Sequence, residues 1–113
     1  MSDRFHIRNA GGTWVVRAAG AVIAESKDAL ELDETGYDPV IYFPRADIAM
    51  PFLDRTEKTT ACPHKGRARY YNVGGKSGTI TDAAWSYEDT TDTAARIRDH
   101  IAFQHDMVTV ERL

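Results

Sequence analysis

Apolar and polar positions along most of the chain alternate with a period of two, which is typical of β-strands. In the first third, β-branched and aromatic residues form short segments punctuated by glycine. These segments are residues 5–10, 13–19 and 21–26. Gly11-Gly12 and Gly20 lie between them and are typical turn residues, so the pattern predicts two hairpins.

The next segments predict strands with different degrees of burial. Leu30 and Leu32 alternate with charged residues, as in a strand with one face in water. Residues 39–43, PVIYF, are apolar throughout, as in a strand that is buried on both faces. Residues 45–56 predict one helical turn followed by an edge strand, because Pro51 cannot donate a hydrogen bond to a neighbouring strand.

A glycine-rich turn predicts a hairpin in the second half of the chain. The sequence GGKS, residues 74–77, separates strand-like segments over residues 67–73 and 78–88. The same glycines invite comparison with a phosphate-binding loop, but Tyr70 stands where that loop needs a glycine. A phosphate-binding loop also leads into a helix, whose N-terminus supplies amide donors, so the hairpin is the better interpretation.

One helix is predicted near the C-terminal end. Thr90 or Thr91 can cap its N-terminus. Ala94, Ile97 and Ile101 recur at helical spacing on one face, and we expect this face to pack on a sheet.

The pattern as a whole predicts a mainly β fold. The chain ends with a strand over residues 107–113, which brings the total to about seven to nine short strands. Antiparallel strands in a curled or barrel-like pair of sheets, with one helix, fit this pattern. With 113 residues, the chain is expected to form a single domain over residues 1–113.

Composition and charge narrow the range of partners. The chain has 14 Lys and Arg against 17 Asp and Glu, a net charge of -3, so it lacks the basic excess that binds nucleic acid. No apolar run is long enough to span a membrane, and residues 1–4 lack the apolar core of a signal peptide. We therefore expect a cytoplasmic protein with neither nucleic acid nor membrane as partner.

No metal site is predicted. A single cysteine, Cys62, excludes an internal disulfide and a zinc site made of two cysteine pairs. His100 and His105 are five positions apart, whereas a metal-binding pair on one helix face needs a spacing of three or four. A site built from His64 and distant carboxylates is the alternative to exposed, hydrated histidines.

The segment TTACPHKGRARYYNV, residues 59–73, is the most chemically distinctive part of the chain. Pro63 favours an extended Cys62, and the sequence HKG then predicts a turn before a strand. The cationic candidates His64 and Lys65 near the thiol would favour the thiolate, which is the nucleophilic form. The alternative is a buried cysteine that acts as a small hydrophobic residue.

Aromatic residues and two carboxylates supply the other candidates for a binding site. The adjacent aromatics at positions 42–43 and 70–71 must point to opposite faces of their strands, whereas Trp85 and Tyr87 share one face. That shared face is either core or the wall of an apolar ligand cavity. Glu34 and Asp47 each lie near the end of an apolar strand, where loops commonly carry functional groups.

Four segments, in this order, closely resemble the family described as domain of unknown function 427. They are residues 20–48, the segment TTACPHKGRARYYNV, AAWSYED at 83–89, and HIAFQHDMVTVE at 100–111. The resemblance covers nearly the whole chain from about Trp14 onward. It implies a β-tent or Mss4-like fold, but this chain has no cysteine pairs for the structural zinc that many proteins of that fold group hold.

The resemblance also marks individual residues. The family's characteristic positions correspond here to Ser26, Glu34, Tyr42, Pro44, Asp47, Thr60, Cys62, Pro63, Lys65, Gly66, Tyr71, Trp85 and Tyr87. His64 stands where many relatives have an aromatic residue. The family carries no established activity, so neither a reaction nor a cofactor is predicted.

Together these observations predict a small-molecule cleft between sheets. Its expected ligand-binding residues are Glu34, Tyr42, Asp47, Cys62, Lys65, Tyr71, Trp85 and Tyr87. In this hypothesis Lys65 pairs with an anionic ligand group or with Glu34. The alternatives are an enzyme that depends on Cys62, with Lys65 and Glu34 as further catalytic candidates, and a non-enzymatic interaction module or homodimer.

Overall fold

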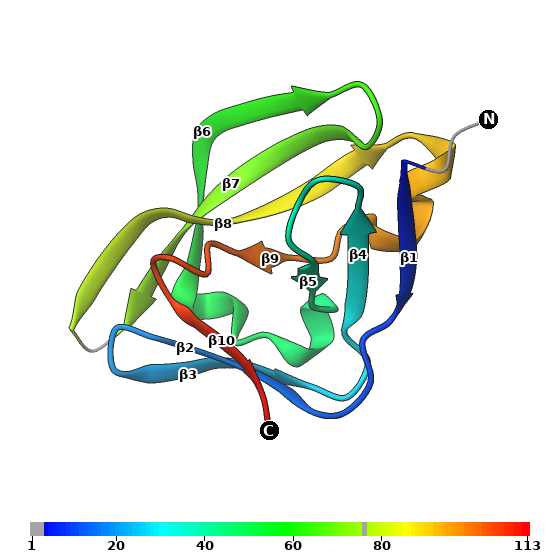
Figure 1. Cartoon of the computed structure of the whole chain (residues 1–113). Helices are drawn as coiled ribbons and strands as arrows, with labels where there is room; N and C mark the ends of the chain where they lie inside the picture. Colours follow the sequence, from blue (N-terminus) through cyan, green and yellow to red (C-terminus); the bar gives the residue numbers. More distant parts are fainter. Residues whose placement is uncertain (1–3, 76) are drawn as a thin grey trace.

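Three antiparallel sheets form the framework of the protein (Figure 1). The structure is a computed structural model that describes residues 4–75 and 77–113. The sheets have the strand orders β1-β4-β5, β10-β2-β3 and β6-β7-β8-β9. The strands are β1 (Phe5–Asn9), β2 (Trp14–Ala18), β3 (Ala21–Ser26), β4 (Leu30–Glu34), β5 (Val40–Tyr42), β6 (Leu53–Cys62), β7 (Gly66–Gly75), β8 (Gly78–Thr90), β9 (Ala102–Phe103) and β10 (Thr109–Arg112). Short 3-10 helices η1 (Arg45–Asp47), η2 (Met50–Phe52) and η3 (Asp92–Ile97) connect them. The prediction of a mainly β, antiparallel fold is confirmed, but the described residues form ten strands in three sheets and not the seven to nine strands in a pair of sheets that the pattern predicted.

The first of the two predicted N-terminal hairpins is wrong, whereas the second is confirmed. β2 pairs with β3, but β1 pairs with β4, so that Ile7 lies opposite Leu32. The reason is packing: Phe5 of β1 is buried in the same cluster as Leu32, whereas Val16 of β2 is buried in a different cluster. Pairing with β4 lets β1 bury its apolar face in the cluster that contains Leu32. Pairing with β2 would not, because Val16 of β2 belongs to the other cluster.

The predicted helix is a 3-10 helix of six residues, η3. Ala94 and Ile97 are fully buried on it, as the spacing predicted, but Ile101 is not part of this helix. Asp99 has a positive φ of 63°, and the backbone of Ile101 instead exchanges hydrogen bonds of 2.8 and 2.9 Å with Phe43. A longer helix would have removed Ile101 from this bridge and from the core.

The structure of residues 45–88 agrees more closely with the strands and turns that the sequence predicted. Residues 45–56 form η1, η2 and the start of β6, which is an edge strand as predicted, although Pro51 lies in η2 and not in the strand. β7 and β8 form the predicted hairpin, with Gly75 opposite Gly78. Lys76 of its turn lies outside the described residues.

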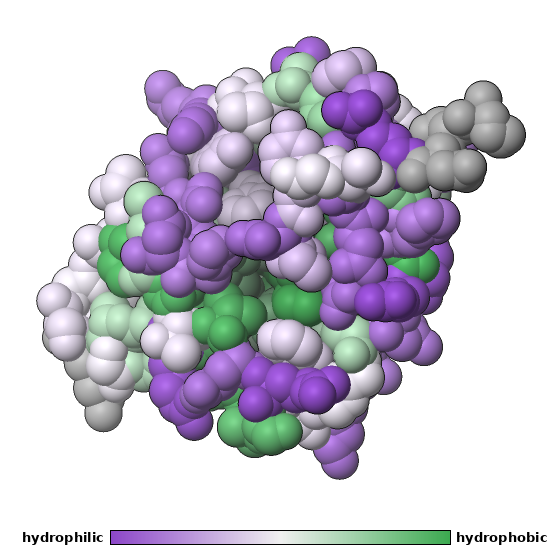
Figure 2. Space-filling view, viewed as in Figure 1, coloured by the Kyte–Doolittle hydropathy of each residue, from purple (hydrophilic) through white to green (hydrophobic). Residues whose placement is uncertain are grey.

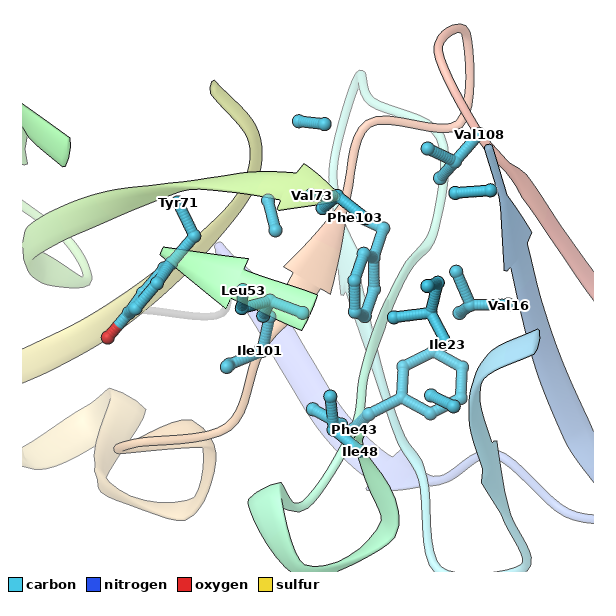
Figure 3. Packing of buried hydrophobic residues seen from close by; sticks show 14 of the residues in the cluster. Val16, Ile23, Phe43, Ile48, Leu53, Tyr71, Val73, Ile101, Phe103 and Val108 are labelled. Atoms are coloured by element: carbon cyan, nitrogen blue, oxygen red, sulfur yellow. The ribbon is translucent and has the colours of Figure 1, made fainter. Parts of the chain in front are cut away.

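Two clusters of buried side chains fill the interior, while the face seen in Figure 2 is largely hydrophilic around a hydrophobic hollow. Figure 3 shows the larger cluster, where the rings of Phe43 and Phe103 meet edge to face with centroids 5.8 Å apart. Tyr42 belongs to the second cluster, so the adjacent aromatics of this segment face opposite ways, as predicted. Tyr71 belongs to the larger cluster, and its neighbour Tyr70 packs against the second.

The turn between β6 and β7 depends on glycine. The amide of Lys65 donates to the carbonyl of Cys62 at 3.3 Å, which closes the predicted turn. Gly66 then starts β7 with a φ of 124°, and a Cβ there would lie 2.1 Å from the carbonyl oxygen of Asp89 on β8. A side chain at this position is excluded both by its backbone conformation and by the close approach of β8.

We predict that Gly66→Ala destabilises the protein more than Gly78→Ala. Gly78 has nearly the same φ, 123°, but its Cβ position has no heavy atom within 4 Å from the described residues other than its chain neighbours, so it matches the backbone strain without the clash. The clash should add about 1–3 kcal/mol to the loss of unfolding free energy. Urea denaturation of both variants measures this difference, and equal losses would contradict the proposed close packing of β7 on β8.

Candidate functional site

A cleft of about 590 Å³ lies beside the turn between β6 and β7. One side is formed by β4, β5 and the loop between them, and the other by β7, β8 and the turn. Six of the residues predicted for the site line it: Glu34, Tyr42, Cys62, Lys65, Trp85 and Tyr87. The fold therefore brings together side chains from segments far apart in the sequence.

An ion pair between Lys65 and Glu34 crosses this cleft. The Lys65 Nζ lies 2.7 Å from Glu34 Oε1, and their side chains are only 13% and 10% exposed. Arg4 adds a weaker contact to the same carboxylate, with its Nε 3.3 Å from Oε2. Of the two partners predicted for Lys65, Glu34 is thus the one present, and the pair connects the end of β4 to the β6–β7 turn.

The pKa of Glu34 is set by its burial and by the two cations, Lys65 and Arg4. Burial disfavours the charged carboxylate and acts to raise its pKa. The hydrogen bond and charge of Lys65, together with those of Arg4, outweigh burial and hold the pKa of Glu34 below its ordinary value. Glu34 is therefore ionised at neutral pH, and Lys65 faces a full negative charge.

Aromatic rings form one wall of the cleft. The register of β7 and β8 sets Tyr70 opposite Trp85, with ring centroids 6.5 Å apart. Tyr42 of β5 meets Trp85 edge to face at 6.4 Å, and the indole Nε1 donates to its hydroxyl at 3.4 Å. Tyr87, two residues along β8, lies on the same face as Trp85, as their spacing predicted.

The phenols of Tyr42 and Tyr87 in this wall are uncharged at neutral pH. Burial raises the pKa of Tyr87 to about 12, and the nearby Cys62 and Tyr70 contribute in the same direction. Burial also raises the pKa of Tyr42 well above its ordinary value. Both hydroxyls therefore keep their protons and are poorly suited to act as general bases.

Cys62 lies at the edge of the cleft, in the last position of β6. It is partly buried, packs against the second hydrophobic cluster and lies opposite Gly66 in the sheet. Within the described residues, no hydrogen bond joins its Sγ to His64 or Lys65. His64 itself is exposed, and its carbonyl accepts a hydrogen bond of 2.9 Å from Thr91.

Two of the predicted site residues lie away from the cleft. Asp47 accepts a hydrogen bond of 2.6 Å from the buried hydroxyl of Ser26, which itself accepts from the amide of Asp28. Tyr71 points to the opposite face of β7 from Tyr70, and its hydroxyl bonds to Glu88. Both side chains take part in structural hydrogen bonds and not in the cleft.

The sequence pattern did not predict the polar network that surrounds Tyr71. Arg45 donates to Tyr71, to the buried Ser86 and to Glu88, at 3.1, 3.1 and 2.9 Å. Arg55 of β6 also binds Glu88, at 2.8 Å. The period of two along β8 places Ser86 and Glu88 on the face opposite Trp85, but no sequence pattern links them to Arg45.

No group of three or more His, Cys, Asp and Glu side chains comes together in the described residues in a way that could hold a metal ion. No helix within residues 4–75 and 77–113 is sufficiently long and apolar to cross a membrane.

The fold and the cleft define a small, mainly β domain of three antiparallel sheets with an aromatic and charged recess between two of them. A family model described as Domain of unknown function (DUF427) matches residues 6–112, so the chain belongs to this family. The resemblance noted from the sequence is thereby confirmed, whereas the β-tent or Mss4-like assignment stays a prediction. Among curated proteins, no match was found.

We predict that Glu88→Gln lowers the unfolding free energy by about 1–3 kcal/mol at neutral pH, because its carboxylate accepts hydrogen bonds from two arginines and a tyrosine. Glu111→Gln is the matched control. Glu111 pairs with Arg17, but both side chains are 48% exposed, so its loss should change stability by less than about 1 kcal/mol. Chemical denaturation measures both, and an equal effect would contradict a structural role for the network.

The effect of Glu88→Gln should also depend on pH. Burial alone would raise the pKa of Glu88, but the hydrogen bonds from Tyr71 and Arg45 and the charge of Arg55 lower it below its ordinary value of 4.5. A lowered pKa means that the carboxylate stabilises the fold fully above pH 4.5 and loses this effect as the pH falls through the folded-state pKa. The stability difference between the two proteins should therefore shrink below that pH, and a constant difference would be inconsistent with this assignment.

Proposed function

We propose that this chain is a small cytoplasmic domain that binds a small molecule in the cleft, with Lys65 and Glu34 as its charged groups and the aromatic wall as its apolar surface. The observation that supports this most is the ion pair itself, whose side chains are 13% and 10% exposed. Removing two charges from water costs free energy that their attraction often fails to recover. Retention of such a pair beside a cavity lined by aromatic rings is typical of a binding site.

Unused hydrogen-bond donors in the cleft also support binding. In the described residues every buried side-chain nitrogen or oxygen has a hydrogen-bond partner. The hydroxyl of Tyr87 makes no such bond there, although the residue is only 8% exposed, so it must open onto the cleft. Lys65 has three N–H donors, of which Glu34 accepts one. A ligand acceptor between Tyr87 and Lys65 would use both groups.

A reaction that depends on Cys62 is the weaker hypothesis. Its thiol needs a general base within hydrogen-bond reach, and the uncharged phenols of Tyr42 and Tyr87 do not meet this need. Since the chain has a single cysteine, a redox cycle would also require an external thiol. Catalytic roles for Cys62, Lys65 and Glu34 therefore stay predictions, and binding is the function that we favour.

An interaction module that pairs through a strand edge is the other alternative. The longest edge strand of the described residues is β6, which is interrupted by a bulge between Arg55 and Thr59. Glu57 and Lys58, in the bulge, are both exposed. Bulges and exposed charges oppose the addition of a strand from another chain, so this edge does not favour homodimer formation.

Binding can be tested with three probes that share one ring but differ in charge: benzoate, benzylammonium and benzyl alcohol. The chain contains two tryptophans, whose indole N–H signals report on different places. We predict that at least one probe shifts the Trp85 signal saturably in NMR spectra, because Trp85 lines the cleft. Absence of a saturable shift with all three probes would contradict the proposed function.

Substitutions of cleft residues test whether the probes bind in the cleft. Lys65→Met should weaken the binding of the anionic probe benzoate about tenfold or more, because a hydrogen-bonding cation is lost from a site with little water. Lys27→Met, at an exposed position after β3, is the matched control and should leave binding unchanged. Tyr87→Phe removes only a hydroxyl and should weaken binding about two- to tenfold without altering the thermal stability by much.

A further inference from the structure

A second, apolar cavity adjoins the cleft. It has a volume of about 400 Å³, and its apolar wall is formed by Trp14, Pro39, Val40, Ile41, Phe103 and Val110. In Figure 2 hydrophobic residues lie in a hollow at the middle of the face, bordered by hydrophilic residues, where Figure 1 draws β5, β9 and β10. All three sheets contribute to this cavity, so it is formed only by the complete fold.

The two cavities share part of their lining. Asp38, Val40 and the indole of Trp85 line both of them. Trp85 is also the ring against which Tyr42 and Tyr70 pack. A ligand that lies along Trp85 can therefore reach from the ion pair into the apolar cavity.

The hydrogen-bond donors of the cleft favour an anionic ligand group. Lys65 and Arg4 both bind the carboxylate of Glu34, and Asp38 adds a second carboxylate to the lining, so these four charges balance in number. The nearby hydroxyl of Tyr87 is an uncharged donor. Arg4 and Asp38 are both exposed, so water and salt screen their charges. The ammonium of Lys65 is only 13% exposed, and it is the shielded cation that faces a ligand.

We propose that the ligand of the cleft is a straight-chain aliphatic carboxylate, a proposal that rests on the binding function proposed above. Its carboxylate lies at Lys65 and Tyr87, and its chain passes Trp85 into the apolar cavity. Each methylene that leaves water for this cavity strengthens binding, whereas the carboxylate accepts the hydrogen bonds that the cleft leaves unused.

The test is a series of straight-chain carboxylates from butyrate to decanoate, below the concentrations at which they aggregate. Affinity should rise about two- to fourfold for each added methylene. All members should shift the indole signal of Trp85, and only the longer ones should also shift that of Trp14, which lines the apolar cavity alone. Affinity that is independent of chain length would overturn the proposal.

Two controls separate this proposal from the binding function itself. Val110→Glu places a charge in the apolar cavity and should abolish the chain-length effect while leaving the response to benzoate unchanged. Val22→Glu, at a position that is 51% exposed on β3, is its matched control and should change neither. If the aromatic probes bind but no carboxylate gains affinity with length, the further proposal fails and the binding function stands.

Charge reversal provides an independent check that needs no variant. Decyltrimethylammonium has an alkyl chain one carbon longer than that of decanoate but a cationic head, and we expect it to bind at least tenfold more weakly than decanoate. Equal binding would overturn the assignment of an anionic head. A Trp14 shift that persists undiminished in Lys65→Met would show binding to the apolar cavity alone and would also overturn the proposal.

Discussion

The alternation of side chains along β5, β7 and β8 is the constraint on which both the core and the cleft depend. Successive residues of a strand point to opposite faces, so Tyr71 enters the larger hydrophobic cluster while Tyr70 faces the aromatic wall. The same alternation sends Trp85 and Tyr87 to the cleft and Ser86 to the opposite face. A shift of register by one residue would exchange the two sets, so one pairing pattern builds both the interior and the site.

The ion pair of Lys65 and Glu34 adds a connection that hydrogen bonds between strands do not provide. Glu34 ends β4, in one sheet, whereas Lys65 lies in the turn that starts β7, in another. The turn holds Lys65 in place because Gly66 allows β7 to start in close contact with Asp89 of β8. The backbone conformation of a single glycine is thus coupled to the electrostatics of the cleft.

Two polar systems lie on opposite sides of β7 and β8, and they differ in how completely they are satisfied. On one side, Arg45 donates to Tyr71, Ser86, Glu88 and a backbone carbonyl, as expected of a structural network. On the other side, the hydroxyl of Tyr87 and two of the three N–H donors of Lys65 have no hydrogen-bond acceptor among the described residues. The cleft thus keeps donors available for a ligand, which is consistent with the binding function proposed above.

The sequence by itself determined the class of fold, most strands, the β7–β8 hairpin and the family, because strand period and turn chemistry are local properties. It also identified Cys62, Lys65, Trp85 and other cleft residues, but it grouped Tyr71 with them. Only the tertiary structure decided that β1 pairs with β4, that the final helix stops after one short segment, and that Arg45 reaches Glu88. These outcomes depend on which buried cluster each side chain can join, and that choice is made between segments far apart in the chain, where local patterns carry no information.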